Sequence, residues 1–229
     1  MTASLFLCLD TSTPTARVAL LDGDGQPRFS SEVTADRHAG HLMPLCAQAL
    51  ASAGLAPAGL AGIACGGGPG SFTGLRVGLA AAKGLALPTG VPLYVVSSLE
   101  ALALDILASR PGATAVPCLD AGKGEVYVAA YAADPQRLVR ELAPSARLNP
   151  DQVAAWCGSL GDALLAGNGA ARYRARLGGL SVADVAGPTA VSVGRLAFAQ
   201  RARGEAADLS SVVPFYGRPP DITVKKKTQ

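Results

Sequence analysis

Short apolar runs separated by polar turns open the chain. The first run covers residues 4–9 and leads into a polar turn at 10–14, and the second covers 17–22 and closes at Gly23-Asp-Gly25. Two such runs predict a hairpin of buried strands, and 27–34 is expected to add a third strand. Apolar residues then recur at helical spacing from Leu42 to Leu50, and the glycine at 54 ends that helix.

The pattern then alternates between strands and helices. A strand is expected at 60–65, followed by a glycine-rich loop at 66–74, a helix to Leu87, a strand at 93–96 and a helix at 98–109. Beyond this point we expect strands at 115–119, 125–131 and 163–166, and helices at 150–157, 170–177 and 189–202. A Gly-Asn-Gly turn follows the last of these strands.

Both halves of the chain open with antiparallel strands and continue into helix–strand alternation, which indicates a structural duplication. Pro and Gly interrupt the periodicity near 110–113, where we place the boundary. We therefore predict an N-terminal lobe at 1–110, a smaller C-terminal lobe at 111–217 and a basic tail at 218–229.

Composition excludes several classes of protein. Hydrophobic residues make up 49% of the 229 residues and charged residues only 16%, so a disordered chain is excluded. The net charge of +3 comes wholly from residues 218–229, because the remainder holds equal numbers of basic and acidic residues. A neutral body is not typical of a nucleic-acid binder. Lys225–Lys227 form either a solvated terminus or a weak phosphate contact to a nucleic acid.

Membrane insertion and secretion are not indicated. The longest apolar runs fall well short of the roughly 20 residues of a spanning helix, and the first ten residues lack the basic segment of a secretory signal. The five cysteines contain no C-x-x-C pair, so we expect buried, reduced thiols in a cytoplasmic protein.

The glycine-rich loop and the helix after it carry the most specific pattern. Residues 66–74 could attract an anion at a helix start or form a tight structural turn, and they match neither the Walker A nor the G-x-G-x-x-G template. Gly70, Gly74, Gly78 and Ala82 recur at four-residue steps, so they share one helix face that permits a close approach. A neighbouring helix of this chain or a helix of a partner would fit that face equally well.

The segment Gly68-Pro-Gly-Ser-Phe-Thr-Gly-Leu-Arg-Val-Gly78 resembles the signature of the bacterial TsaB (YeaZ-like) family. Four further blocks also resemble that family: 9–13, His38 with 42–44, 96–102 and 119–127. The stretch Pro214-Phe-Tyr-Gly-Arg218 resembles the family's C-terminal Pro-x-Tyr-x-Arg. The likeness covers nearly the whole chain.

This resemblance implies an α/β fold of the two-lobed actin-like, sugar kinase and Hsp70 (ASKHA) type with RNase H-like lobes. It also implies a role in forming threonylcarbamoyladenosine next to the tRNA anticodon. The implied partners are the homologous TsaD-type transferase and a small TsaE-type ATPase, and tRNA is reached only through the complex. A homodimer through the same helices is the alternative when the partner is absent.

The resemblance further implies that the chain is not an enzyme but an essential non-catalytic partner and activator. The catalytic relative binds its metal with a His-x-x-x-His pair, and the matching positions here are Ser98 and Leu102. Leucine cannot ligate a metal. Ser71 lacks the glycine that a nucleophile elbow needs two residues later, since Thr73 stands there. An independent ATPase or metallopeptidase of the same fold is the alternative.

Two sets of site residues follow from this reading. No cofactor is firmly implied, although ADP or ATP could bind at the interface with the partner. No catalytic residue and no metal site are predicted. The candidate nucleotide residues are Asp10, Thr11, Ser12, Asp120, Gly167 and Gly169. The candidate partner-interface residues are His41, Leu42, Leu45, Gly74, Val77, Gly78, Ala81 and Ala82.

Overall fold

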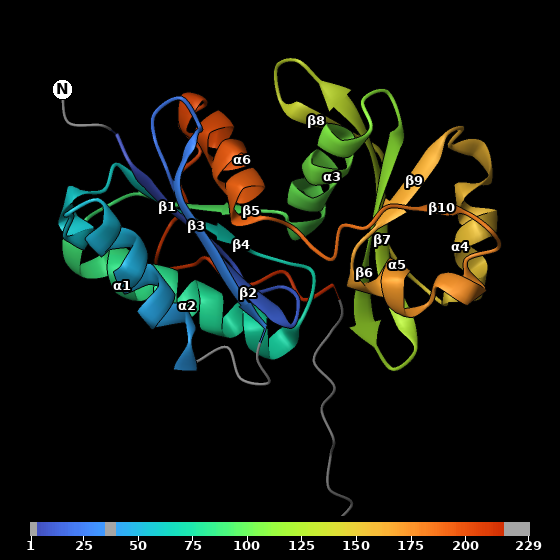
Figure 1. Cartoon of the computed structure of the whole chain (residues 1–229), viewed down its shortest axis with the longest axis horizontal. Helices are drawn as coiled ribbons and strands as arrows, with labels where there is room; N and C mark the ends of the chain where they lie inside the picture. The colour runs from blue at the N-terminus through green and yellow to red at the C-terminus, as the bar shows by residue number, and fades with distance from the viewer. Residues whose placement is uncertain (1–3, 35–39, 218–229) are drawn as a thin grey trace, which may run out of the picture.

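The computed structural model describes residues 4–34 and 40–217 and contains two mixed sheets of five strands each (Figure 1). The first sheet has the order β3-β2-β1-β4-β5. Its strands are β1 (Phe6–Asp10), β2 (Thr15–Leu21), β3 (Pro27–Thr34), β4 (Gly62–Gly66) and β5 (Leu93–Val96).

The second sheet repeats this arrangement in the order β8-β7-β6-β9-β10. Its strands are β6 (Thr114–Gly122), β7 (Glu125–Asp134), β8 (Leu138–Leu148), β9 (Ala163–Ala166) and β10 (Ser181–Val182). In each sheet the central strand, β1 or β6, is antiparallel to the next strand in sequence and parallel to β4 or β9. The equal order and sense confirm the structural duplication that the pattern predicted.

Helices form three layers around the two sheets (Figure 1). Helices α1 (Leu42–Ser52) and α2 (Phe72–Thr89) cover the outer face of the first sheet. Helices α4 (Pro150–Trp156) and α5 (Asn168–Arg172) cover the outer face of the second sheet. Helices α3 (Ser98–Ser109) and α6 (Ala190–Ala202) lie between the sheets. Short 3-10 turns occupy Pro57–Gly59, Cys157–Ser159 and Arg174–Arg176.

Alternation along β1 explains how a strand of only five residues supports two cores. Leu7 and Leu9 point into the cluster beneath α1 and α2, whereas Phe6 and Cys8 point into the central cluster between the sheets. Successive side chains of a strand face opposite sides, so a continuous apolar run is required where both faces are buried.

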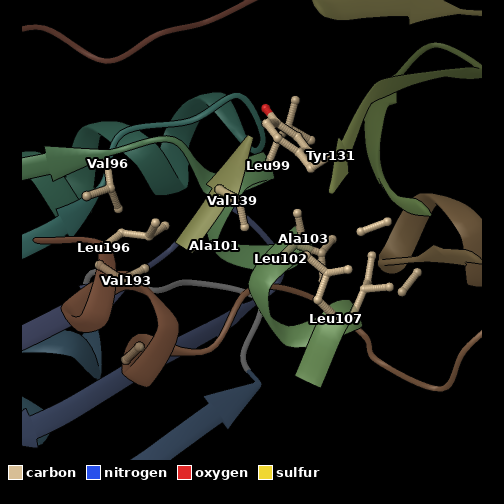
Figure 2. Packing of buried hydrophobic residues seen from close by; sticks show 14 of the residues in the cluster. Val96, Leu99, Ala101, Leu102, Ala103, Leu107, Tyr131, Val139, Val193 and Leu196 are labelled. Carbon is tan, nitrogen blue, oxygen red and sulfur yellow. The ribbon is translucent and has the colours of Figure 1, made fainter. Parts of the chain in front are cut away.

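The central core joins the two lobes (Figure 2). It gathers side chains of β5, α3, β7, β8 and α6, and the picture shows Leu102 of α3 in the same cluster as Val193 of α6. Helix α3 packs mainly on β6 and β7, and α6 returns to the first sheet. Asp105 of α3 fixes this crossing, because its carboxylate accepts hydrogen bonds from the backbone N–H of Thr189 and from the hydroxyl groups of Thr189 and Ser192. The predicted boundary near 110 therefore separates the two sheets but not the helices that pack on them.

Three elements differ from the sequence prediction. Strand β8 was missed because only Val139 of its eleven residues is buried and Pro144 lies within it, so it shows little hydrophobic pattern. The two-residue β10 was missed as well. The predicted helix at 170–177 is wrong: α5 ends at Arg172, and the chain tightens into a 3-10 turn whose Arg176 binds Asp151 of α4.

The cysteines follow the prediction, since all five are buried and unpaired. None of the helices in the described ranges is long and apolar enough to span a membrane. His38 and the predicted basic tail, with Arg218 and Lys225–Lys227, lie outside the described residues.

Candidate functional site

The glycine face of α2 packs against the first lobe's own β1–β2 turn. A Cβ atom at Gly74 would collide with the backbone oxygen of Thr11, and one at Gly78 would collide with the Thr11 hydroxyl. The same hydroxyl donates a hydrogen bond of 2.7 Å to the Gly74 carbonyl. The occupant of this face is therefore neither a neighbouring helix nor a partner's helix, but a turn of the same chain.

This contact corrects part of the predicted partner interface. Gly74, Gly78 and Ala82 are buried in the chain, and so are Leu42 and Leu45, which point from α1 into the core beneath it. Five of the eight predicted interface residues are thus not available to a partner. The spacing identified a close backbone approach correctly but not what approaches.

The remaining predicted residues lie at the edge of a different surface. His41 is exposed at the start of α1, and Val77 and Ala81 are half-buried on α2. Beyond them, α1 and α2 expose small and apolar side chains on their solvent sides. This surface, called the exposed helix face below, consists of Met43, Ala47, Ala51, Ala80, Gly84 and Leu87.

Three measurements define the exposed helix face. Leu87 is 61% exposed and Met43 44% exposed, and a Cβ atom added at Gly84 would meet no atom within 4 Å. Both helices pack on the same side of the first sheet, so their solvent sides point outward together (Figure 1). Sequence reasoning missed these residues. The signal was that α2 has only two charged residues, Arg76 and Lys83, and an almost wholly apolar helix is normally covered on every side.

A cleft of about 270 Å³ lies between the lobes. The β1–β2 turn contributes Ser12, the glycine-rich loop contributes Ser71 and Phe72, the β6–β7 turn contributes Asp120, and the start of α5 contributes Asn168. The structure therefore brings two of the six candidate nucleotide residues, Ser12 and Asp120, to one cleft.

Asp10 and Thr11 do not line this cleft. Asp10 is fully buried, and its carboxylate accepts hydrogen bonds from the backbone N–H and the hydroxyl of Ser12 and from the hydroxyl of Ser98. Burial raises the pKa of Asp10 against the lowering effect of these bonds and of Arg17. The carboxylate of this candidate nucleotide residue therefore organises the turn and does not face the cleft.

The candidate nucleotide residues of the second lobe also interact mainly with other residues of that lobe. The Asp120 carboxylate accepts a hydrogen bond from the N–H of Gly122 and forms an ion pair of 2.7 Å with Arg172. Gly167 and Gly169 let the α5 start approach β6, because a Cβ atom at Gly169 would lie 2.7 Å from the carbonyl carbon of Leu119. Both glycines thus serve helix–strand packing and lie outside the lining of the cleft.

The positions that match the relative's metal ligands are closed. Ser98 is fully buried and bound to Asp10, and Leu102 lies in the central core. Over residues 4–34 and 40–217, no group of three or more His, Cys, Asp or Glu side chains could hold a metal ion.

The last described segment, 212–217, crosses back over the glycine-rich loop. The N–H of Phe215 donates to the Gly67 carbonyl at 2.8 Å, and the Tyr127 hydroxyl donates to the carbonyl of Tyr216. The rings of Tyr216 and Phe72 are 4.7 Å apart. This contact was not predicted, although the Pro-x-Tyr-x-Arg block was the sequence signal for it.

Comparisons with known proteins agree with this architecture. A family model described as TsaD, tRNA N6-adenosine threonylcarbamoyltransferase, matches residues 29–172, more than half of the chain. The tRNA threonylcarbamoyladenosine biosynthesis protein TsaB of Escherichia coli is 33% identical over 147 residues, covering 64% of this chain and 63% of that protein. The protein of the same name from Haemophilus influenzae is 37% identical over 121 residues, covering 53% of this chain and 51% of its own length. The match thus spans less than two thirds of these curated relatives.

Solved structures extend the likeness over the whole chain. The structure of YeaZ from Pseudomonas aeruginosa has a TM-score of 0.81 and 32% identity, covering 93% of this chain and 99% of that one. An activator of a 2-hydroxyisocaproyl-CoA dehydratase from Clostridium difficile has a TM-score of 0.52 at 12% identity, covering 89% of this chain and 98% of its own. This last likeness concerns the fold alone and confirms the two-lobed ASKHA-type class. The chain belongs to the TsaB (YeaZ-like) family.

Proposed function

We propose that this chain is a non-catalytic subunit of the complex that forms threonylcarbamoyladenosine next to the tRNA anticodon. It binds a TsaD-type transferase through the exposed helix face and activates it. A TsaE-type ATPase joins the pair, and tRNA is reached through the complex in the cytoplasm. The names of the curated TsaB relatives support the pathway.

The exposed helix face carries this proposal. Scattered exposed apolar residues are normal, but exposed apolar and small residues gathered on two neighbouring helices are typical of an interaction site. Ala47, Ala51, Ala80 and Gly84 have little or no side chain, so a partner's helices could approach the backbone closely. Met43 and Leu87 would then be the large apolar anchors that such interfaces commonly centre on.

A homologous partner fits this face well. The match to the TsaD family model over residues 29–172 indicates that this chain and the transferase are related. Two related lobes can pair through equivalent helices around an approximate two-fold axis, as isologous interfaces do. The same reasoning allows a homodimer when the partner is absent, with one copy replacing the transferase.

Two positions that would be expected to act in catalysis, Leu102 and Asp10, support a non-catalytic role for this chain. Leu102 offers no ligand atom where the resemblance places the second metal-binding histidine of the relative. Asp10 is enclosed by Ser12 and Ser98 and does not reach the cleft. A general base needs access to its substrate, and the enclosed Asp10 has none.

A nucleotide at the partner interface is the second part of the proposal. The interlobe cleft offers Ser12, Asp120 and Asn168 as polar groups. Its volume of about 270 Å³ lies below the range of roughly 300–1,000 Å³ that is usual for ligand pockets. ADP or ATP would therefore have to place part of the molecule against the partner. Calorimetric titration of ADP into the chain alone and into the heterodimer tests this. Equal affinity in both would contradict it.

Co-purification with the TsaD-type homologue tests the main proposal. We expect Leu87→Asp to abolish the heterodimer on size-exclusion chromatography, because an aspartate would be desolvated in an apolar contact. Leu142→Asp is the matched control, since Leu142 is 40% exposed on β8 of the second lobe. The modified nucleoside, measured by mass spectrometry, should disappear when the Leu87→Asp chain replaces the parent.

The rival activity is tested with the chain alone. A stoichiometric metal, or nucleotide turnover that Asp120→Ala removes, would establish an independent ATPase or metallopeptidase and overturn the proposal. A heterodimer that survives Leu87→Asp but not Leu142→Asp would place the partner on the second lobe.

A further inference from the structure

A second hollow lies beside the glycine-rich loop, distinct from the interlobe cleft and from the exposed helix face. It has a volume of about 380 Å³ and runs between the end of β5, the start of α3, strands β7 and β8, and the segment 212–217. We call it the acidic groove and define it by Val95, Glu100, Tyr131, Glu141, Val213 and Phe215.

The wall of the groove is apolar, although it faces solvent. Val213 is 72% exposed and Phe215 58% exposed. The hydrogen bond from the Phe215 N–H to the Gly67 carbonyl fixes the backbone of this wall. On the opposite side the wall continues with Leu99 and Tyr131, which lie next to each other in Figure 2. Exposed apolar residues that line a preformed groove are typical of a docking site.

Two carboxylates line the groove, and neither forms an ion pair in the described part of the chain. Glu100 is on α3, and Glu141 is on β8 directly opposite Tyr131 in the strand register. Within 4–34 and 40–217, neither carboxylate forms an ion pair or accepts a hydrogen bond. Burial and the nearby charge of Glu141 raise the pKa of Glu100, whereas Arg203 and Arg137 lower it.

The arginines do not fill the groove. Arg137, Arg140 and Arg203 line a separate hollow of about 290 Å³ on the other side of the two carboxylates. Arg203 is further occupied by a two-bond pairing with Glu205. Glu100 and Glu141 therefore line both hollows, and in the groove they stand beside the apolar side chains of Val213 and Phe215, with no arginine among the described lining residues.

We propose that the acidic groove binds an extended segment of a partner protein in which a lysine or arginine stands next to an apolar side chain. Long basic side chains bury an aliphatic stem on apolar surface and keep their charge at its edge. The stem would lie on Val95 and Phe215, and the cationic head would lie between Glu100 and Glu141. The neighbouring apolar residue of the segment would contact Val213.

Peptide binding to the purified chain tests this proposal. The probe is a fluorescein-labelled hexapeptide of alternating leucine and lysine, and its control has glutamate in place of lysine. We expect the lysine peptide to shift backbone amide NMR signals of 95–100 and 213–215 and the glutamate peptide not to do so. The double variant Glu100→Gln with Glu141→Gln should weaken binding about five- to tenfold, and Phe215→Ser should weaken it by a similar factor.

Three outcomes would decide against the groove. Affinity that is unchanged in both variants would overturn the proposal, as would signal shifts confined to the exposed helix face. Displacement of the peptide by spermidine at equal concentration would show that charge alone explains the binding and that the apolar wall of the groove does not contribute. Asp162→Asn, an exposed acid on the second lobe, is the control that should leave affinity unchanged, and thermal unfolding verifies that each variant is folded.

Discussion

Helix α2 has small residues on two opposite sides. Gly74 and Gly78 face the β1–β2 turn, whereas Ala80 and Gly84 face solvent. Two residues correspond to about 200° around a helix, so the two sets lie back to back. On the buried side small residues let the turn approach the helix backbone, and on the exposed side they leave the helix backbone accessible to another molecule. Equal composition therefore does not imply an equal role.

The largest expected effect comes from adding one methyl group to the buried side. Gly74→Ala and Gly78→Ala should each lower the free energy of unfolding by about 3 kcal/mol, because overpacking against a fixed neighbour costs this order of energy. At Gly74 the neighbour is the Thr11 backbone oxygen, which has no rotamer with which to withdraw. Urea unfolding measures the change.

An unchanged midpoint for both variants would show that Thr11 does not rest on α2. The contrast between the buried and the exposed side of α2 would then not hold, and Gly74 and Gly78 would again be candidates for the partner interface.

The next effect concerns the exposed side. Met43→Ala and Leu87→Ala should each weaken binding to the TsaD-type homologue about tenfold, because removing a large apolar side chain at the centre of an interface commonly costs about 1–2 kcal/mol. The free energy of unfolding of the isolated chain should stay within about 0.5 kcal/mol of the parent, as is usual for exposed positions. Isothermal titration calorimetry gives the first quantity and urea unfolding the second. A loss of stability without a loss of affinity would identify these residues as core.

The sequence was sufficient for most of the fold because the relevant signals are local. The apolar runs that became β1 and β4, and the glycine-rich signature, needed no tertiary information. Strand β8 could not be found, since its eleven residues are mostly exposed and owe their conformation to pairing with β7.

The site was harder to predict for a different reason. A four-residue step such as Gly74 to Gly78 reports that something approaches closely, but the identity of the approaching group depends on how β1 and β2 turn at Thr11. Asp10 was likewise placed at the right turn, yet whether its carboxylate faces a cleft or Ser98 is decided by a residue 88 positions away.

A smaller effect concerns Asp10, whose carboxylate organises the β1–β2 turn that packs on the buried side of α2. The folded protein binds the Asp10 proton more tightly than the unfolded chain does, because burial raises the pKa of Asp10 above 3.8. The contribution of this group to stability is therefore greatest at low pH and is lost as the pH rises through the folded pKa.

Asp10→Asn should remove this loss, since the amide oxygen can still accept from Ser12 and the amide N–H can donate to Ser98. At pH 7 the variant should be more stable than the parent by about 1 kcal/mol, in line with the replacement of other buried charges. The difference should shrink as the pH is lowered toward 4 in urea unfolding. A difference that grows toward low pH would mean that the charged form is the one that the turn stabilises.

The smallest effect is expected from a glycine on the exposed side of the same helix. Gly84→Ala adds the same methyl group to the same helix as Gly74→Ala, but on the side where no atom lies within 4 Å. Alanine is favoured over glycine in a helix interior by about 0.5–1 kcal/mol, so this variant should be more stable than the parent by that amount in urea unfolding. Affinity for the TsaD-type homologue should fall at the same time, because the methyl group would stand between the two helix backbones. A variant that gains stability and keeps full affinity would show that no partner backbone comes close at Gly84, and the proposed contact would then rest on Met43 and Leu87 alone.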